Sequence, residues 1–190
     1  MTRSQWVGLV GVVLLLATAV VIGEREPDPA GGGPDLSELR AAASLPACPT
    51  GLGLDADLSL PCLAGGPDVP VDAPLAGPTV VNIWGTWCAP CVDEVPELVE
   101  FAERAAGKIA VVGVLTSDTA RNGLAFADEF DVTYPQVLDD QGEVRARYGA
   151  GAPLTLFLRG DGRLAHVESG AMESVEEIEA LAATHLGVRL

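Results

Sequence analysis

Runs of apolar residues and their spacing divide the chain from residue 58 onward into strands and helices. Short runs rich in Val, Ile and Leu are typical of buried strands, and apolar residues three or four positions apart are typical of amphipathic helices. The pattern predicts strands at 58–60, 69–71, 79–84, 109–115, 136–138, 154–158 and 164–167. It predicts helices at 91–105, 122–130, 143–148 and 174–186.

The order of these elements predicts an α/β fold. The strands at 79–84 and 109–115 flank a helix, as in a βαβ unit with parallel strands. The strands at 154–158 and 164–167 are separated by a Gly-containing turn, which favours an antiparallel hairpin. We therefore expect a central mixed sheet flanked by helices and covered on both faces, with a small edge hairpin at 58–71.

The N-terminal segment has the pattern of a targeting sequence. Residues 6–22 are almost wholly apolar, with Arg3 before them and charged residues at 24–26 after them. This arrangement is typical of one membrane span whose N-terminus stays inside the cell. We expect residues 1–23 to be an uncleaved anchor that leaves the remaining chain outside the cytoplasm. Cleavage near residues 17–19 is the alternative, and it would give a secreted protein.

Residues 24–46 are predicted to be a flexible linker, because the first part is rich in Pro, Gly and acidic residues. A short helix at 35–43, capped by Ser37, is expected within this linker, and we assign it no function. The folded domain is then expected to span 47–190. Its first part, 47–72, forms an N-terminal extension.

The composition argues against one class of partner. The chain carries a formal net charge of −16 and no cluster of Lys or Arg. Proteins that bind nucleic acid or anionic lipid generally use a basic patch. We therefore expect no nucleic-acid partner, membrane contact only through the N-terminal segment, and a monomer.

Cys88-Ala89-Pro90-Cys91 follows the predicted strand at 79–84 directly. If a helix begins at the first cysteine, the two sulfurs lie on one face and can close a small ring. Cys88 at the helix N-terminus is favoured as a thiolate and is the predicted nucleophile, whereas Cys91 resolves the mixed disulfide. A zinc site is the alternative for this spacing. We expect no cofactor and no bound metal.

A second pair, Cys48 and Cys62, flanks a loop rich in Gly, Asp and Pro. Outside the cytoplasm, a structural disulfide between them is the main expectation. The alternatives are a second redox pair that exchanges with Cys88 and Cys91, and a zinc site of four cysteines. His166 and His185 are isolated in the sequence, so neither is predicted to bind metal.

The stretch Val80–Cys91, followed by Glu94, Pro96 and Gly151-Ala152-Pro153, resembles the extracytoplasmic thioredoxin-like proteins of the TlpA/ResA (DsbE-like) type. The resemblance covers roughly residues 58–190. It implies a thioredoxin-like fold with an insertion at 116–151, before the strand that opens with the family's cis-proline.

The resemblance also implies a function and its partners. Members of the family exchange disulfides with protein dithiols and disulfides outside the cytoplasm, and many serve cytochrome c maturation. A membrane protein that donates or accepts electrons is the expected partner. The competing hypothesis is a metal-binding module, for copper or zinc, with no enzymatic activity. The sequence does not distinguish a reductase from an oxidase acting in oxidative folding.

The resemblance assigns roles to individual residues. Pro153 corresponds to the cis-proline that faces the two cysteines, and Ala152 stands where the family usually has a β-branched residue. The backbone here would pair with an extended substrate. Trp87 is a candidate for substrate contact. Glu94 matches a glutamate near the family's active site and is the predicted proton-transfer partner of Cys91.

Asn82 stands where cytoplasmic thioredoxins carry a buried acid. An amide cannot shuttle protons, so the acid/base role is expected to fall to Glu94. Asn82 shares a strand face with Val80 and Trp84 and must be hydrogen-bonded there.

Overall fold

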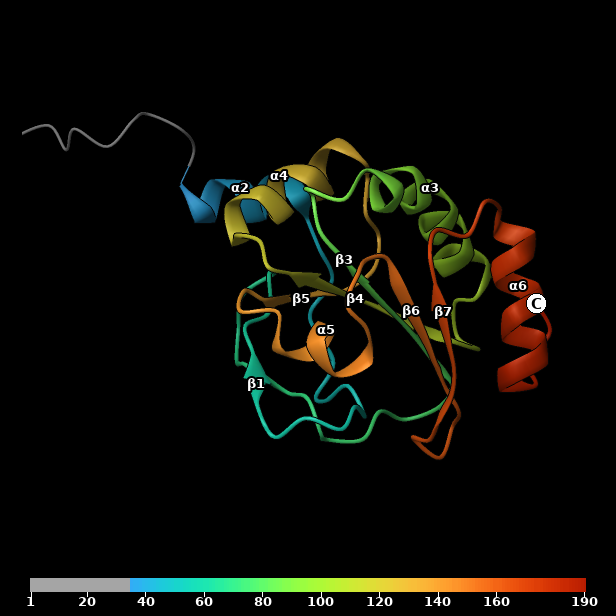
Figure 1. Ribbon diagram of the computed structural model, residues 1–190. Coiled ribbons are helices and arrows are strands. Elements are labelled where there is room, and N and C mark those ends of the chain that lie inside the picture. The colour runs from blue at the N-terminus through green and yellow to red at the C-terminus, as the bar shows by residue number, and fades with distance from the viewer. Residues whose placement is uncertain (1–34) are drawn as a thin grey trace, which may run out of the picture. The chain divides into compact units, whose positions relative to one another are not determined.

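A five-stranded mixed sheet forms the centre of the fold (Figure 1). In chain order its strands are β3 (Thr79–Trp84), β4 (Ala110–Thr116), β5 (Gln136–Asp139), β6 (Leu154–Leu158) and β7 (Leu164–Ser169). The spatial order is β5-β4-β3-β6-β7. The first three strands are parallel, while β6 runs antiparallel to both β3 and β7. This confirms the predicted α/β fold with a mixed sheet.

The computed structural model describes residues 35–190. The predicted anchor at 1–23 and the first part of the predicted linker lie outside these residues. Within the described part of the chain, no helix has both the length and the apolar character needed to cross a membrane.

Helices cover one face of the sheet. They are α2 (Leu36–Ala43), α3 (Ala89–Arg104), α4 (Ala120–Glu129) and α6 (Val175–Leu186). Val80 and Trp84 of β3 pack here with Leu98 and Phe101 of α3 and Ile178 of α6. This helical face contains Cys88 and Cys91, so we call it the active-site face.

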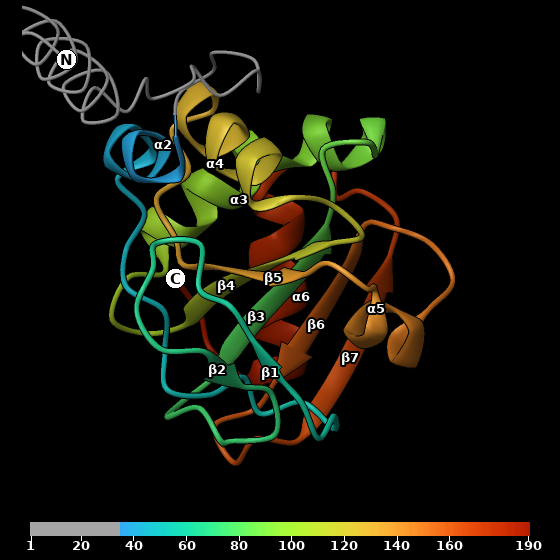
Figure 2. The ribbon, with the colours of Figure 1, turned by 90° about the vertical axis from the view of Figure 1, so that its left-hand side faces the viewer.

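The N-terminal extension covers the opposite face. β1 (Ser59–Leu60) and β2 (Val69–Pro70) form the predicted antiparallel hairpin, and Figure 2 shows them in front of the central strands. Val81 and Ile83 pack on this side with apolar residues of the extension and with Val144 of α5 (Glu143–Tyr148). Because both faces are covered, every residue of β3 is buried, which explains its mainly apolar sequence.

The extension also protects the outer edge of β5, the strand supplied by the predicted insertion. Cys62 forms an antiparallel bridge with Val137. The backbone N–H of Leu63 donates to the carbonyl of Gln136 at 2.9 Å, and Leu138 N–H donates to the carbonyl of Pro61 at 2.9 Å. These bonds occupy backbone groups that an exposed edge strand would leave unpaired.

Helix starts differ from the sequence predictions at α2, α3 and α4, and α4 begins at Ala120 instead of residue 122. α2 is capped by Asp35, not Ser37, because Asp35 and Glu38 form a reciprocal capping box. This helix belongs to the region that we expected to be linker, yet Ala43 is buried in the core. α3 begins at Ala89 with Cys88 as N-cap, before the start predicted at residue 91.

A row of polar positions crosses the sheet in register. It runs through Gln136, Gly113, Asn82, Thr155 and Glu168, one residue from each strand. Paired residues lie on the same face of a sheet, so these side chains lie on the active-site face. Gly113 has no space for a side chain, since a Cβ atom would collide with the amide of Gln136.

Candidate functional site

Cys88 and Cys91 form a disulfide at the start of α3, with their Cα atoms 5.2 Å apart. Pro90 lies in the first turn, where a missing N–H removes no helical hydrogen bond. Cys91 is fully buried, whereas Cys88 keeps 5% of its surface exposed. A thiolate on Cys88 would lie at the positive end of the helix dipole. The geometry therefore suits Cys88 as the sulfur that meets a substrate.

Trp87 is an exposed aromatic residue next to this disulfide. The exposed fraction of the whole residue is 54%. The indole Nε1–H donates to the carbonyl of Thr116 at 3.1 Å. The ring lies close against Gly85, where any Cβ atom would collide with it. Trp87 is thus anchored at one edge and open to solvent on its outer surface, as a contact for substrate requires.

Asp118 joins the loop before α3 to the loop before α4. Its Oδ2 accepts hydrogen bonds from Thr86 N–H at 2.9 Å and from Thr86 Oγ1–H at 2.6 Å. Its Oδ1 accepts from Thr119 N–H and from Asn122 Nδ2–H, each at 2.8 Å. Partial burial raises the pKa of Asp118, but these hydrogen bonds outweigh burial and hold the pKa below its ordinary value. Thr86 lies two residues before Cys88, so this clamp positions the disulfide loop.

The Ala152–Pro153 peptide bond is cis, as the resemblance implied. Ala152 packs against the hydrophobic cluster that contains Cys88 and Cys91. The carbonyl of Pro153 accepts a hydrogen bond from Gly170 N–H at 3.1 Å. Within residues 35–190, the backbone of Ala152 has no such partner. Ala152 therefore has backbone groups free for an extended peptide.

Glu94 lies one helical turn after Cys91 and is buried, with 1% of its surface exposed. Its Oε1 accepts from Met172 N–H at 3.0 Å, and its Oε2 accepts from Asn82 Nδ2–H at 3.1 Å. Burial raises the pKa of Glu94 to about 7, although these two hydrogen bonds lower it. A carboxyl group with such a pKa can accept and return a proton near neutral pH.

Asn82 is fully buried in β3 on the face predicted from the sequence. Besides Glu94, its Nδ2 also donates to Thr155 Oγ1 at 3.0 Å. Its Oδ1 has no hydrogen-bond partner among the described residues. The expectation that Asn82 is hydrogen-bonded is therefore correct for the amide nitrogen and wrong for the oxygen.

Cys48 and Cys62 form the predicted second disulfide, with Cα atoms 5.9 Å apart. Cys62 is buried on the face opposite to Cys88 and Cys91, and Cys48 packs against the same side. The sheet separates the two pairs. This arrangement favours the structural role over direct exchange between the two pairs, which was one of the alternatives for Cys48 and Cys62.

The two histidines lie together between β7 and α6. The rings of His166 and His185 stack with centroids 4.0 Å apart, and His166 Nε2 lies 3.0 Å from Glu168 Oε2. Nothing in their sequence positions indicated this contact. In the part of the chain that the structure describes, no group of three or more His, Cys, Asp or Glu side chains is arranged to hold a metal ion.

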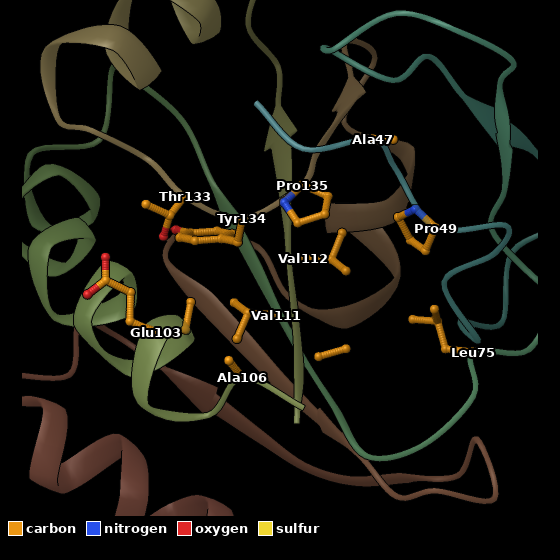
Figure 3. Close-up of a pocket in the computed structure, with 12 residues that line it drawn as sticks. Ala47, Pro49, Leu75, Glu103, Ala106, Val111, Val112, Thr133, Tyr134 and Pro135 are labelled. Carbon is orange, nitrogen blue, oxygen red and sulfur yellow. The ribbon is translucent and has the colours of Figure 1, made fainter. Parts of the chain in front are cut away.

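An apolar pocket of about 460 Å³ lies near the start of β4 (Figure 3). Val111 and Val112 line it, together with Tyr134 and Pro135. Cys88, in contrast, follows the end of β3, which is parallel to β4. The pocket thus lies at the other end of these strands from the disulfide, and it contains none of the predicted site residues.

Sequence reasoning missed Asp118, Thr155 and Glu97. Glu97 accepts a hydrogen bond from Val175 N–H at 2.9 Å, at the N-terminus of α6. One signal could have found Asp118, because it follows the end of a strand parallel to the one before Cys88. The carboxyl ends of parallel strands meet at one edge of a sheet.

Comparison with known proteins agrees with this geometry. A family model described as Redoxin matches residues 55–182. The chain is 34% identical to the thiol-disulfide oxidoreductase ResA of Oceanobacillus iheyensis over 95 residues, which cover 49% of this chain and 50% of that protein. The match therefore spans half the length of that relative. The chain is 30% identical to the thiol:disulfide interchange protein DsbE of Xylella fastidiosa over 170 residues, which cover 87% of this chain and 77% of that protein.

Solved structures show the same fold. The chain is 27% identical to MTB DsbF, solved in its mixed oxidized and reduced forms, with a TM-score of 0.57. That match covers 66% of this chain and 95% of DsbF. A secreted disulfide oxidoreductase of Mycobacterium tuberculosis gives a TM-score of 0.59 at 23% identity, covering 67% of this chain and 96% of that one. The chain belongs to the Redoxin family, with a thioredoxin-like fold and with relatives named thiol-disulfide oxidoreductases.

Proposed function

We propose that this chain is a thiol:disulfide oxidoreductase that acts outside the cytoplasm and is held at the membrane by residues 1–23. It exchanges the Cys88–Cys91 disulfide with protein dithiols and disulfides. The observation that carries the proposal is this disulfide at the N-terminus of α3, beside the exposed Trp87. The names of the relatives support the same activity.

The reaction that the site supports has two exchange steps. In the reducing direction, the Cys88 thiolate attacks a substrate disulfide, which forms a mixed disulfide and releases one substrate thiolate. Cys91 then loses its proton and attacks the Cys88 sulfur. This step forms the Cys88–Cys91 disulfide and releases the second substrate thiolate. The oxidising direction is the reverse sequence.

Glu94 is the proposed proton acceptor for Cys91. The Cys91 thiol is buried, and burial in apolar surroundings raises the pKa of a thiol, so a base is needed on the protein side. Glu94 lies one turn further along the same helix, and its pKa of about 7 suits this exchange. Trp87, Ala152 and Pro153 are proposed to hold the extended substrate segment.

For the physiological setting, we propose cytochrome c maturation, with a membrane protein as electron donor. The support is the resemblance to TlpA/ResA-type proteins, many of which serve that process. This setting requires a reductase. An oxidase of oxidative protein folding is the competing assignment, and the reduction potential separates the two.

The test is the reduction potential of the purified protein in thiol/disulfide buffers, followed by the fluorescence of Trp87. We expect one two-electron transition, absent in Cys88→Ser and retained in a Cys48→Ser/Cys62→Ser variant. A potential near that of thioredoxin, about −270 mV, supports the reductase, and one near about −120 mV supports the oxidase. A transition that persists in Cys88→Ser, or stoichiometric metal in the reduced protein, would overturn the proposed activity.

A further inference from the structure

The side chain of Asn82 has an unequal set of hydrogen bonds. Both donors of its amide are used, on Glu94 Oε2 and on Thr155 Oγ1, while Oδ1 receives no hydrogen bond within residues 35–190. The side chain is fully buried, so bulk solvent does not reach it. An unpaired buried carbonyl oxygen is destabilising, and a folded protein that retains one needs a reason.

The observed hydrogen bonds, in which both oxygens of Glu94 accept, suit its ionised form. Oε1 accepts from Met172 N–H at 3.0 Å and Oε2 accepts from Asn82 at 3.1 Å. A proton on Oε2 would point at an amide hydrogen of Asn82, which is a contact between two donors. Because burial raises the pKa of Glu94 to about 7, the protonated form is well populated near neutral pH. That form needs an acceptor in place of the amide nitrogen.

We propose that the Asn82 amide turns about its Cβ–Cγ bond when Glu94 takes up a proton, so that one side chain serves both protonation states of the carboxyl group. This inference rests on the proposed role of Glu94 and deepens it. After the turn, Oδ1 lies where Nδ2 was and accepts the O–H of Glu94. The Thr155 hydroxyl can donate as well as accept, so it also pairs with Oδ1.

Each of the two orientations of the Asn82 amide leaves one end of the amide without a hydrogen bond, so their free-energy costs are similar. With Glu94 ionised, Oδ1 is unpaired, and with Glu94 protonated, Nδ2 takes its place as the unpaired end. On this side of the sheet the neighbouring position on β4 is Gly113, so no side chain there holds either end of the amide. The Gln136 side chain fills that space, and its Oε1 accepts from Trp84 Nε1–H at 2.9 Å.

Other groups that face Glu94 affect the pH at which the Asn82 amide turns, not the need for that rotation. The negative charges of Glu168 on β7 and Glu177 on α6 both raise the pKa of Glu94. The buried phenol of Tyr134 senses the Glu94 charge, which raises the phenol's own pKa further. Cys91 lies on the preceding turn of α3, and in the reduced protein its thiol is the group whose proton Glu94 is proposed to accept. Asn82 is therefore a positioning residue for this proton transfer.

The decisive measurement follows the two side-chain amide protons of Asn82 by NMR between pH 5 and 9, in the oxidised full-length protein. We expect both resonances to move with one midpoint, equal to that of the Glu94 carboxyl carbon, because the turn removes the acceptors of both protons. If the amide stays fixed, only the proton that faces Glu94 moves, and the proposal fails. The Asn122 amide is an internal control, since its acceptor Asp118 has a lowered pKa.

Variants give an independent test. In Glu94→Gln, the Asn82 resonances should no longer titrate. In Asn82→Leu, each form of Glu94 loses one hydrogen bond to the amide, so the Glu94 midpoint should change by less than about one pH unit, whereas a fixed amide, which serves the ionised form alone, predicts a larger rise. Thr79→Val is the matched control, because Thr79 is another buried polar residue of β3 that does not contact Glu94. A rise of well over one pH unit in Asn82→Leu would show that the amide serves the ionised form alone, and it would overturn the inference. These NMR titrations need no catalytic turnover. They can therefore contradict this inference without contradicting the proposed oxidoreductase activity, and the reverse also holds.

Discussion

Glu94 is an acidic side chain in a place where its charged form is poorly solvated. Its pKa of about 7 lies above the ordinary value of 4.5. Between these two values, the folded protein binds this proton more tightly than the unfolded chain does. The stabilising contribution of the bound proton is therefore complete below about pH 4.5 and is lost as the pH rises to about 7.

This linkage predicts a difference between two oxidised proteins. From pH 4.5 to 7, the Glu94 term should lower the free energy of unfolding by about 3 kcal/mol, a decrease that Glu94→Gln should lack. Denaturant unfolding at several pH values measures the slope of the free energy of unfolding against pH in each protein. The contributions of all other titrating groups cancel when the two slopes are compared. Asp93→Asn, at the exposed neighbouring position, should keep the wild-type slope. Equal slopes in wild type and Glu94→Gln would show that Glu94 is ionised throughout this range.

At the scale of elements, the active site depends on contacts between loops that are distant in sequence. The loop between β3 and α3 carries Thr86 and Trp87, and both are bonded to the end of β4 or the loop after it. On the other side of the site, α6 begins against α3, because Glu94 and Glu97 accept backbone N–H groups of Met172 and Val175. A carboxylate at a helix N-terminus also complements the helix dipole.

Removal of the Asp118 carboxylate should therefore loosen the loop that carries Trp87 and Cys88. In Asp118→Ala, we expect the free energy of unfolding to fall by about 2 kcal/mol, since partly buried donors on Thr86 lose their acceptor. KM for a protein disulfide should rise more than kcat falls, because the loop positions substrate. Stopped-flow turnover and denaturant unfolding measure the two effects. Asp128→Ala, at an exposed position of α4, is the matched control. A wild-type KM in Asp118→Ala would contradict this role of the clamp.

The sequence predicted these elements better than the contacts between them. The apolar residues of β3 and the spacing of Cys88 and Cys91 are local signals. The buried strand and the Cys88–Cys91 disulfide were therefore predicted correctly. The choice of Asp35 over Ser37 as the cap of α2 was not predictable, because either residue suits an N-cap. The Thr86–Asp118 clamp and the bonds of the extension to β5 depend on strand order and register, which local patterns do not specify.

At the scale of the whole molecule, the Cys48–Cys62 disulfide ties the N-terminal extension to the main sheet. It closes a loop whose ends are 14 residues apart in sequence, and Cys62 bridges the edge strand β5. The extension has only a two-stranded hairpin of its own. Its attachment therefore relies on this crosslink and on packing against the sheet.

Removal of this crosslink should weaken the fold without changing the redox site. For Cys48→Ser/Cys62→Ser, we expect a loss of about 3 kcal/mol in the free energy of unfolding. The potential of the Cys88–Cys91 pair should stay at its wild-type value. Calorimetry and redox titration test the two parts. A shifted potential would show that the second disulfide influences the active site through β5.

The sheet that lies between the two cysteine pairs affects which of the two disulfides a substrate can reach. A thiolate that docks beside Trp87 reaches Cys88, but the strands stand between it and Cys62. Each proposed catalytic cycle can therefore reduce and reform the Cys88–Cys91 disulfide while the Cys48–Cys62 disulfide stays oxidised. In the proposed reaction, the chain can pass electrons many times while the Cys48–Cys62 disulfide, which stabilises the fold, stays intact.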